Sequence, residues 1–290
     1  TVLVSGGPME SGVYKGHKVS LPAMFEAVGA TQAGKMTRDE LSCLEDCACP
    51  GCGSCCGMYT ANSMNCLMET LGIALPGNGT ILATCSARIR LAKEAGKAIM
   101  KAVADDVTPR MILTKRAFLN AIACDNAIGA STNSVLHLIA IASECGIELD
   151  YDMFRKAAEC TPNLCKLSPA SEYDMDALGK AGGIMAVLKE LARKNLIDGG
   201  AMTINGKTLA ENFRAADITD PAVIHTCDEP LSPIGGLAFL KGNIAEGGAV
   251  VKRSAVRKEM LKFTGVAKCY NSEEDAVRAI MGGEIKPGNV

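Results

Sequence analysis

A cluster of cysteines constrains this chain more than any other feature of its sequence. Five of them fall between Cys47 and Cys56, in the stretch CACPGCGSCC. Cys49, Cys52 and Cys55 follow the spacing C-x2-C-x2-C, which is typical of ferredoxin loops that point several thiolates at one iron-sulfur cluster. Small residues that let a backbone fold tightly accompany them, namely Gly51, Gly53, Ser54 and Gly57. The stretch therefore predicts a loop folded around a metal.

Zinc is the alternative metal for such a loop. Structural zinc sites usually take four ligands from two separated pairs, and no second C-x2-C or histidine pair follows in a chain with three histidines. A helix that begins shortly after the loop also favours thiolates, because unpaired N-H groups at a helix N-terminus lower the pKa of a cysteine. The spacing favours an iron-sulfur cluster over zinc, and purely structural thiols are the third interpretation.

The charge balance limits the partners of the chain. Thirty basic and 32 acidic residues give a net charge of -2, which leaves no electrostatic footprint for nucleic acid or for an anionic membrane. No apolar run reaches the roughly 18 residues of a membrane-spanning helix, and TVLVSGGPM lacks the pattern of a signal peptide. We expect a cytoplasmic protein with reduced thiols, whose partners are small molecules or other subunits, with no nucleic acid and no membrane.

Helical periodicity dominates the first two thirds of the chain. Val2 to Val4 read as a short buried strand, followed by a glycine turn from Ser5 to Pro8, and Thr37 with Glu40 forms a capping box that starts a helix. Apolar spacing and stop signals predict further helices over residues 88–104, 115–123, 135–145, 152–159 and 184–194. This part of the sequence predicts a helix-rich α/β domain.

The sequence pattern changes near Leu231, where short apolar segments alternate with glycine turns. GLAFLKG, GAVVKR and GVAKCY predict strands, and a late helix is expected over residues 273–281. The polar stretch 217–230 with its two prolines is the expected linker. The predicted fold class is therefore α/β, with a helix-rich α/β N-terminal domain over 1–220 and the start of a β-rich, β-barrel-like C-terminal domain over 231–290.

Long stretches of the chain, far more specific than a C-x2-C spacing, point to a known family. They are VSGGPM, CPGCGSCCGMYTANSMNCLMETLGIALPGNGT, IGASTNSVLHL, TPNLCKLSPASEYDMDALGKAGGI, PLSPIGGLAFLKGNIAEGGAVVK and KFTGVAKCY. In this order they resemble the dihydroxy-acid dehydratase branch of the family that also contains sugar-acid and phosphogluconate dehydratases. The GMYTANSMN version is similar to the dihydroxy-acid branch rather than to the sugar-acid branches. The resemblance covers essentially the whole chain.

The resemblance narrows the role of the cysteine loop. Family members bind a 2Fe-2S or 4Fe-4S cluster through three cysteines that are spread along the chain, and one of these lies in a G-S-C-x-G-M context, which is Cys55 here. Three protein ligands would leave one iron free for substrate. Cys49 and Cys52 then become secondary candidates for metal binding. Cys56, which stands where relatives often have a small residue, is a third secondary candidate that can compete for the metal, although we expect it to pack.

The resemblance also implies that the chain is an internal fragment of an enzyme that forms a homodimer. Two further cluster cysteines and Mg²⁺ ligands, including an aspartate beside a lysine, are expected before the segment TVLVSGGPM. A magnesium-binding glutamate and the serine that acts as base are expected beyond KPGNV. No catalytic residue is therefore assigned within this sequence.

Five polar residues are candidates for binding the substrate. Ser131, Thr132 and Asn133 form a polar trio at the start of an expected helix, where hydroxyl and N-H groups can bind a carboxylate. Simple N-capping is the equally weighted alternative for this trio. Thr60 and Asn62 are similar candidates close to Cys55.

The implied reaction removes water from a 2,3-dihydroxy acid such as 2,3-dihydroxy-3-methylbutanoate and gives a 2-oxo acid in branched-chain amino acid biosynthesis. Hydroxide is a poor leaving group, so a Lewis-acid iron is expected to lower that barrier. A sugar-acid or phosphogluconate dehydratase of the same family is the first alternative. Outside the family, the alternatives are an electron-transfer iron-sulfur module and a zinc-stabilised scaffold.

Overall fold

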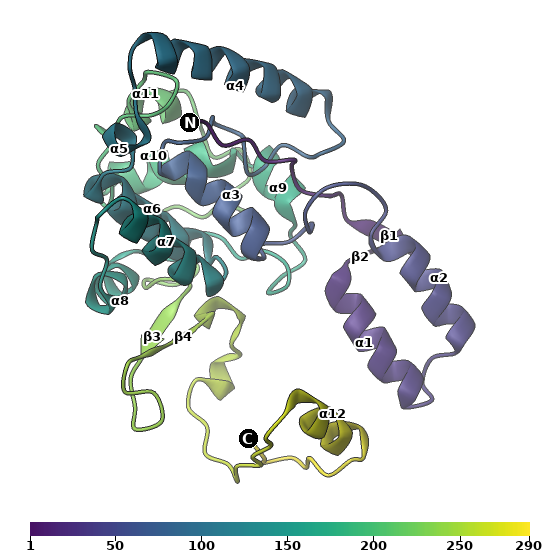
Figure 1. The fold of residues 1–290 in the computed structure, drawn as a ribbon. Coiled ribbons are helices and arrows are strands. Elements are labelled where there is room, and N and C mark those ends of the chain that lie inside the picture. The colour runs from purple at the N-terminus through teal and green to yellow at the C-terminus, as the bar shows by residue number, and fades with distance from the viewer. The chain divides into compact units, whose positions relative to one another are not determined.

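Short-range signals in the sequence define most helices of the computed structural model, which describes residues 1–290 (Figure 1). The side chain of Thr37 accepts from the backbone N-H of Glu40, and the Glu40 carboxylate accepts from the backbone N-H of Thr37, so the capping box starts helix α2 as expected. The first helices are α1 (Leu21–Gln32), α2 (Arg38–Ala48), α3 (Thr60–Thr70), α4 (Ser86–Ala104), α5 (Pro109–Ile112) and α6 (Lys115–Ile128). The later ones are α7 (Asn133–Glu144), α8 (Tyr151–Cys160), α9 (Met175–Lys180), α10 (Gly183–Arg193), α11 (Leu209–Phe213) and α12 (Glu273–Met281).

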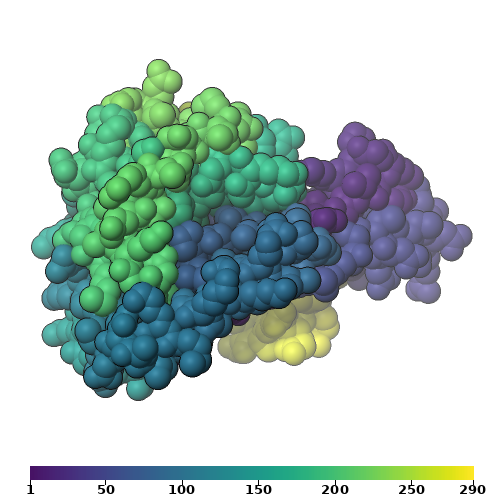
Figure 2. Space-filling model, turned by 90° about the horizontal axis from the view of Figure 1, so that it is seen from above, coloured from purple at the N-terminus to yellow at the C-terminus, as the bar shows by residue number.

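The predicted helices after the cysteine loop are all confirmed, and α12 has the expected bounds. Helix α6 is the centre of the core. It is buried on nearly every side, because it packs against α3, α7, α8 and α10. Helix α4 lies on the surface and is seen in blue in the space-filling view from above (Figure 2). No helix combines the length and the apolar character that crossing a bilayer requires.

Strands are few and short. Two antiparallel hairpins occur, one formed by β1 (Gly12–Tyr14) with β2 (His17–Val19) and one by β3 (Ala238–Leu240) with β4 (Ala249–Val251). The expected strands in GLAFLKG and GAVVKR are confirmed as β3 and β4. These residues form no closed barrel, and the barrel-like character of the C-terminal domain stays a prediction.

Two expected strands are wrong as extended elements. The segment from Val2 to Val4 makes one parallel bridge, between Leu3 and Ala74, and GVAKCY makes one bridge, between Val266 and Asn289. A strand needs a partner along its length, whereas Leu3 forms a single bridge and the backbone pairing of GVAKCY with residues 288–290 ends at Lys268. Their apolar residues are also exposed, as Leu3 and Val266 illustrate.

The chain divides into two compact units, Thr1–Ser254 and Ala255–Val290. In the smaller unit, α12 begins after Ser272, whose hydroxyl accepts from the backbone N-H of Asp275 at 3.1 Å. In the larger unit, part of the expected linker 217–230 packs into the core, because Ile224 is fully buried and bridges to Cys165. The domain bounds 1–220 and 231–290 stay a prediction beside this division.

A substitution of Phe154, on α8, tests the packing of the β3–β4 hairpin against the core, because Phe154 contacts Phe239 of β3. The ring of Phe154 is fully buried and lies 5.8 Å from the ring of Phe239, centroid to centroid. Phe154→Ala is expected to lower the free energy of unfolding by about 3 to 5 kcal/mol, because it leaves a cavity in the core. Urea unfolding measures this, with Phe25→Ala as control, since Phe25 is 70% exposed. A loss at Phe25 as large as that at Phe154 would contradict the placement of the core.

Candidate functional site

The N-terminal segment supports one side of the cysteine loop. The backbone N-H of Ser54 donates to Gly7 O at 2.9 Å, and the N-H of Met9 donates to Ser54 O at 2.7 Å. A Cβ on Gly7 would lie 2.7 Å from Ile81 O, so this glycine turn is packed against its neighbours. The turn from Ser5 to Pro8 therefore holds the loop in place.

The segment before α9 supports the other side of the loop. The N-H of Met58 donates to Ser168 O, and the N-H of Met175 donates to Cys56 O, both at 2.8 Å. A Cβ on Gly57 would lie 2.6 Å from Ser168 O. Glycine is thus required here by close approach of two backbones, which confirms the prediction of a tightly folded loop.

The cysteines of the loop do not converge on one point. Cys49 and Cys52 are exposed, Cys55 is half-buried and Cys56 is buried. A pocket of about 260 Å³ is lined by Cys49, Cys55 and Cys56, together with Met9, Ser20, Leu21, Ala48, Gly53, Ser54, Tyr59 and Ala61. No group of three or more His, Cys, Asp or Glu side chains is gathered as a metal site. Cys52 lies outside the residues that line this pocket.

The expected lowering of the cysteine pKa is wrong for Cys55. Burial raises the pKa of this thiol, and the neighbouring Cys56 raises it further. The N-terminus of α3, which begins at Thr60, does not outweigh the loss of solvation. A nearby positive charge such as a metal ion would favour the thiolate of Cys55 against this effect of burial.

Asn62 lies beneath the loop as a fully buried amide. Its Nδ2 donates to the carbonyl oxygens of Cys55 and Gly57, the latter at 2.7 Å, and its Oδ1 accepts from the Ser54 hydroxyl at 2.6 Å. Both ends of the side chain are thus occupied by the backbone and a hydroxyl of the cysteine loop. These three hydrogen bonds let Asn62 stabilise the conformation of the loop.

The other candidate residues come together from two helix N-termini. The hydroxyl oxygens of Thr60, on α3, and Ser131 lie 3.1 Å apart, and Asn133 Nδ2 donates to Thr60 Oγ1 at 2.8 Å. We call Thr60, Ser131 and Asn133 the hydroxyl cluster. Tyr59 and Ala61, which flank Thr60, line the pocket that contains Cys55. The structure thus places this cluster beside the cysteine loop.

N-capping does not account for the whole polar trio. Thr132 is the N-cap residue of α7, and its side chain makes no capping hydrogen bond. The hydroxyl of Ser131 accepts from the N-H of Asn133 at 3.2 Å, so a local cap-like contact exists at that residue. Ser131 and Thr132 are half-buried, and Asn133 is exposed.

Three polar residues beneath the hydroxyl cluster are missed by the sequence patterns. Asp125 on α6 is fully buried, and its Oδ2 accepts from the Ser134 hydroxyl at 2.8 Å. Lys252, which follows β4, donates to Met58 O in the cysteine loop at 3.2 Å. Asp125 is the only charged residue between Ala117 and Ile128 of α6, and this is the one signal that could have indicated it. Nothing in the sequence near Lys252 points to this contact.

Asp125 and Glu69 make stability depend on pH. Burial raises the pKa of each carboxyl to about 7, although Ser134 and Lys252 act against the shift at Asp125 and two backbone N-H groups act against it at Glu69. Between about pH 4 and pH 7 the folded chain therefore binds more protons than the unfolded chain. The free energy of unfolding is expected to fall as the pH rises through this window.

Asp125→Asn tests that expectation. The asparagine cannot titrate, so the fall in unfolding free energy between pH 4.5 and pH 7.5 is expected to shrink by about 3 kcal/mol. Urea unfolding at a series of pH values measures it, and Asp105→Asn is the control because Asp105 lies on the surface. An unchanged pH dependence in Asp125→Asn would contradict a protonated buried carboxyl.

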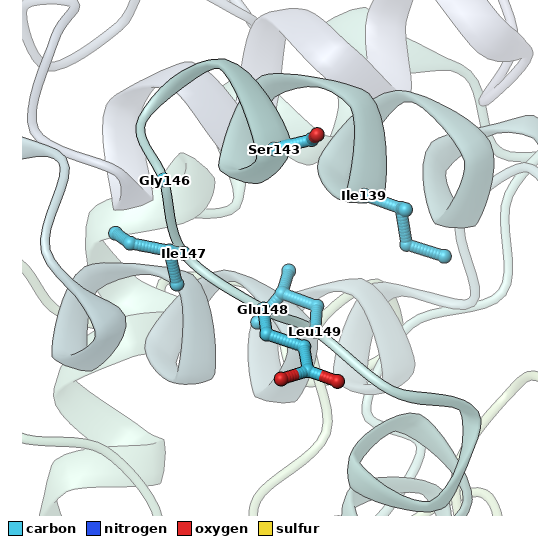
Figure 3. A pocket seen from close by; sticks show the side chains of 6 residues that line it. All are labelled: Ile139, Ser143, Gly146, Ile147, Glu148 and Leu149. Carbon is cyan, nitrogen blue, oxygen red and sulfur yellow. The ribbon is translucent and has the colours of Figure 1, made fainter.

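A second pocket contains none of the predicted residues. It has a volume of about 340 Å³ and is lined by Ile139 and Ser143 of α7 and by residues 146–149 of the segment that follows (Figure 3). Glu148 supplies its single carboxylate, and Ile139, Ile147 and Leu149 supply aliphatic side chains. The pocket offers no cysteine and no paired polar groups, so the cysteine loop remains the candidate site.

Comparison with known proteins agrees with the motifs. Residues 1–212 match the family model described as dihydroxy-acid/6-phosphogluconate dehydratase N-terminal, and residues 222–290 match the corresponding C-terminal model. The chain is 54% identical over 289 residues to a dihydroxy-acid dehydratase of Moorella thermoacetica and 53% identical over 291 residues to one of Nitratidesulfovibrio vulgaris. In both comparisons 100% of this chain is covered and 52% of the relative. The chain thus spans about half the length of these curated relatives.

Proposed function

The chain belongs to the dihydroxy-acid/6-phosphogluconate dehydratase family, and from that premise we propose that it forms part of a hydro-lyase that converts 2,3-dihydroxy acids into 2-oxo acids. Relatives that share about half of its residues are named dihydroxy-acid dehydratase. The observation that carries the proposal is the pairing of a half-buried thiol, Cys55, with a neighbouring cluster of hydroxyl and amide groups. Branched-chain amino acid biosynthesis is the proposed pathway.

The residues present fit one attachment point of an iron-sulfur cluster. Cys55 faces a pocket whose other lining side chains are mostly small or apolar, and soft thiolate ligands in such surroundings suit iron-sulfur centres. Its raised pKa fits as well, since a thiol without a compensating charge holds its proton until a metal displaces it. Cys55 is the proposed ligand, with Cys49 and Cys56 in the same pocket as secondary candidates. The other cluster ligands and the Mg²⁺ ligands are proposed to lie in parts of the enzyme outside residues 1–290.

In the proposed mechanism the residues of this chain bind and orient the substrate. When bound, the cluster supplies a Lewis acid for the departing C3 hydroxyl. Ser131, Thr132 and Thr60 offer hydroxyls, and Asn133 an amide, at two adjoining helix N-termini whose free N-H groups favour a carboxylate. Asn62 holds the carbonyls of the cysteine loop and so fixes the position of Cys55. Holding C2 and C3 of the substrate in one orientation is the contribution that this geometry supports.

The wider organisation is proposed on the resemblance alone. We propose a homodimer in the cytoplasm and a C-terminal domain that begins a β-rich, barrel-like fold within residues 231–290. Small dihydroxy acids are the proposed substrates, with no nucleic-acid or membrane partner. Size-exclusion chromatography with light scattering of the full-length protein tests the dimer.

The function is tested by anaerobic reconstitution of the full-length protein with iron and sulfide. We expect visible absorption from an iron-sulfur cluster and release of a 2-oxo acid from 2,3-dihydroxy-3-methylbutanoate, with much slower turnover of gluconate and 6-phosphogluconate. Faster turnover of a sugar acid would favour the other branches of the family. Bound zinc without sulfide, or a cluster without any dehydration, would overturn the proposal.

A further inference from the structure

Arg88 is a buried arginine whose place at the start of α4 does not stabilise that helix. It is 6% exposed and lies in the first turn, where the partial positive charge of the helix N-terminus disfavours a cation. Its guanidinium instead donates to three carbonyl oxygens outside the helix. These are Ser5 O at 3.2 Å, Asn78 O at 3.0 Å and Ile81 O. Arg88 therefore ties the N-terminal segment to the turn that precedes α4.

Asn78 is a second anchor for the same part of the N-terminal segment. Its side chain is buried, and its Oδ1 accepts from the backbone N-H of Ser5 at 2.8 Å. The turn around Asn78 is itself fixed to α3, because the Glu69 carboxylate accepts from the N-H groups of Gly77 and Gly79 at 2.8 and 2.7 Å. Both backbone polar groups of Ser5 are thus held by buried side chains, the N-H by Asn78 and the carbonyl by the arginine.

A short chain of hydrogen bonds leads from Ser5 to the cysteine loop. The Ser5 hydroxyl accepts from the N-H of Gly7 at 3.0 Å. Gly7 O accepts from the backbone N-H of Ser54 at 2.9 Å and from its hydroxyl at 3.3 Å, and Ser54 directly precedes Cys55. A Cβ on Gly7 would lie 2.8 Å from Arg88 Nε, so the guanidinium also packs against this glycine. The support beneath Cys55 therefore depends on where Ser5 is held.

Apolar side chains contribute little to holding the start of this segment. Leu3 and Val4, which lead into it, are 42% and 46% exposed. Ser5 itself is half-buried. Hydrogen bonds from a charged donor are stronger than those between neutral groups, and a guanidinium offers its donors in a fixed fork. The contacts of Ser5 with Arg88 and Asn78 are therefore the main restraints on its position.

We propose that Arg88 and Asn78 are positioning residues for the thiol of Cys55. They hold Ser5, and through it the carbonyl of Gly7 on which the cysteine loop rests, and so keep Cys55 in the lining of the 260 Å³ pocket. Neither residue needs to touch substrate or metal. The catalytic consequence rests on the proposed function, whereas the effect on the thiol itself is independent of it.

The test is the rate at which single cysteines of the full-length protein, prepared without metal, react with iodoacetamide, resolved by peptide mass spectrometry. Arg88→Met is expected to raise the rate at Cys55 about tenfold, because loss of a hydrogen bond from a charged donor shifts a local opening equilibrium by at least that factor. The rate at Cys52, which is already exposed, is expected to stay the same. Cys124 is fully buried in the core and reacts only when the chain unfolds, so it is expected to stay unlabelled over the same period.

Arg90→Met is the matched control, because Arg90 lies on the same helix and is exposed. It is expected to leave the rate at Cys55 unchanged, and a wild-type rate in Arg88→Met would overturn the proposal. If Arg88→Met also labels Cys124, Asn78→Ala decides, since it removes one of the two anchoring hydrogen bonds and keeps the arginine with its three carbonyl acceptors. A raised rate at Cys55 with Cys124 unlabelled supports the proposal. A wild-type rate, or labelling of Cys124 in both variants, overturns it.

A second readout is turnover by the full-length enzyme. Arg88→Met is expected to lower kcat/KM about tenfold, with partial rescue by Arg88→Lys, which keeps a cationic donor. Such a loss is in the range seen when outer residues that orient a metal ligand are removed. If the wild-type enzyme dehydrates no dihydroxy acid, the proposed function fails, while the labelling result still decides the role of Arg88 and Asn78.

Discussion

Cys55→Ser in the full-length protein is expected to abolish both the iron-sulfur cluster and the dehydratase activity, leaving less than about 1% of wild-type turnover, since removal of an essential ligand removes the metal chemistry. A serine hydroxyl is a harder and far less acidic ligand than a thiol, so it does not replace the thiolate at iron. Cys55 is the loop cysteine that combines a lining position in the 260 Å³ pocket with backbone carbonyls held by Asn62. Visible absorption, iron and sulfide analysis and a 2-oxo acid assay measure the two losses.

Cys52→Ser is the matched control for that experiment. Cys52 lies three residues earlier in the same loop and is exposed, and it does not line the pocket. We expect this variant to keep most of the cluster and most of the activity. Equal losses in Cys52→Ser and Cys55→Ser would show that the ligand is misassigned and would favour the self-contained loop suggested by spacing.

Local signals predict the helices of this protein well because their causes lie within a few residues. The capping box of Thr37 with Glu40 and the N-cap of Ser272 each satisfy backbone donors three positions away. The strands are harder, because a strand exists only where a partner runs beside it. Val2 to Val4 have the apolar composition of a buried strand, yet the segment forms a single bridge, between Leu3 and Ala74.

The same distinction between local and long-range causes applies to the candidate site. Cys55 and the trio from Ser131 are visible in the sequence, because cysteine spacing and helix starts are local patterns. The meeting of Thr60 with Ser131 joins residues 71 apart, and the contact of Lys252 with Met58 joins residues 194 apart. No periodicity encodes such contacts. The pKa of Cys55 is a further example, since burial, which depends on the whole fold, overrides the local influence of the helix N-terminus.

Loss of the hydroxyl cluster is the second large effect that we expect. Thr60→Val with Ser131→Ala in the full-length enzyme is expected to lower kcat/KM about 100-fold, because hydrogen bonds to a charged group are worth about 1.5 to 3 kcal/mol each. Each single variant is expected to account for more than half of that loss in free energy. The two hydroxyls lie 3.1 Å apart and act as one unit, so a double-mutant cycle is expected to be strongly non-additive. Steady-state kinetics with 2,3-dihydroxy-3-methylbutanoate measures the cycle.

A serine that only caps a helix, Ser272, serves to distinguish simple N-capping by Ser131 from substrate binding by Ser131. Ser272 caps α12 through a 3.1 Å bond, and Ser272→Ala is expected to cost about 1 kcal/mol of unfolding free energy without a change in KM. If Ser131 were only a cap, Ser131→Ala would give the same pattern, a loss of stability with unchanged kinetics. Binding of the substrate carboxylate instead requires KM to rise in Ser131→Ala at a temperature where the variant stays folded, because a group that contacts substrate acts on its affinity and a cap acts on the helix.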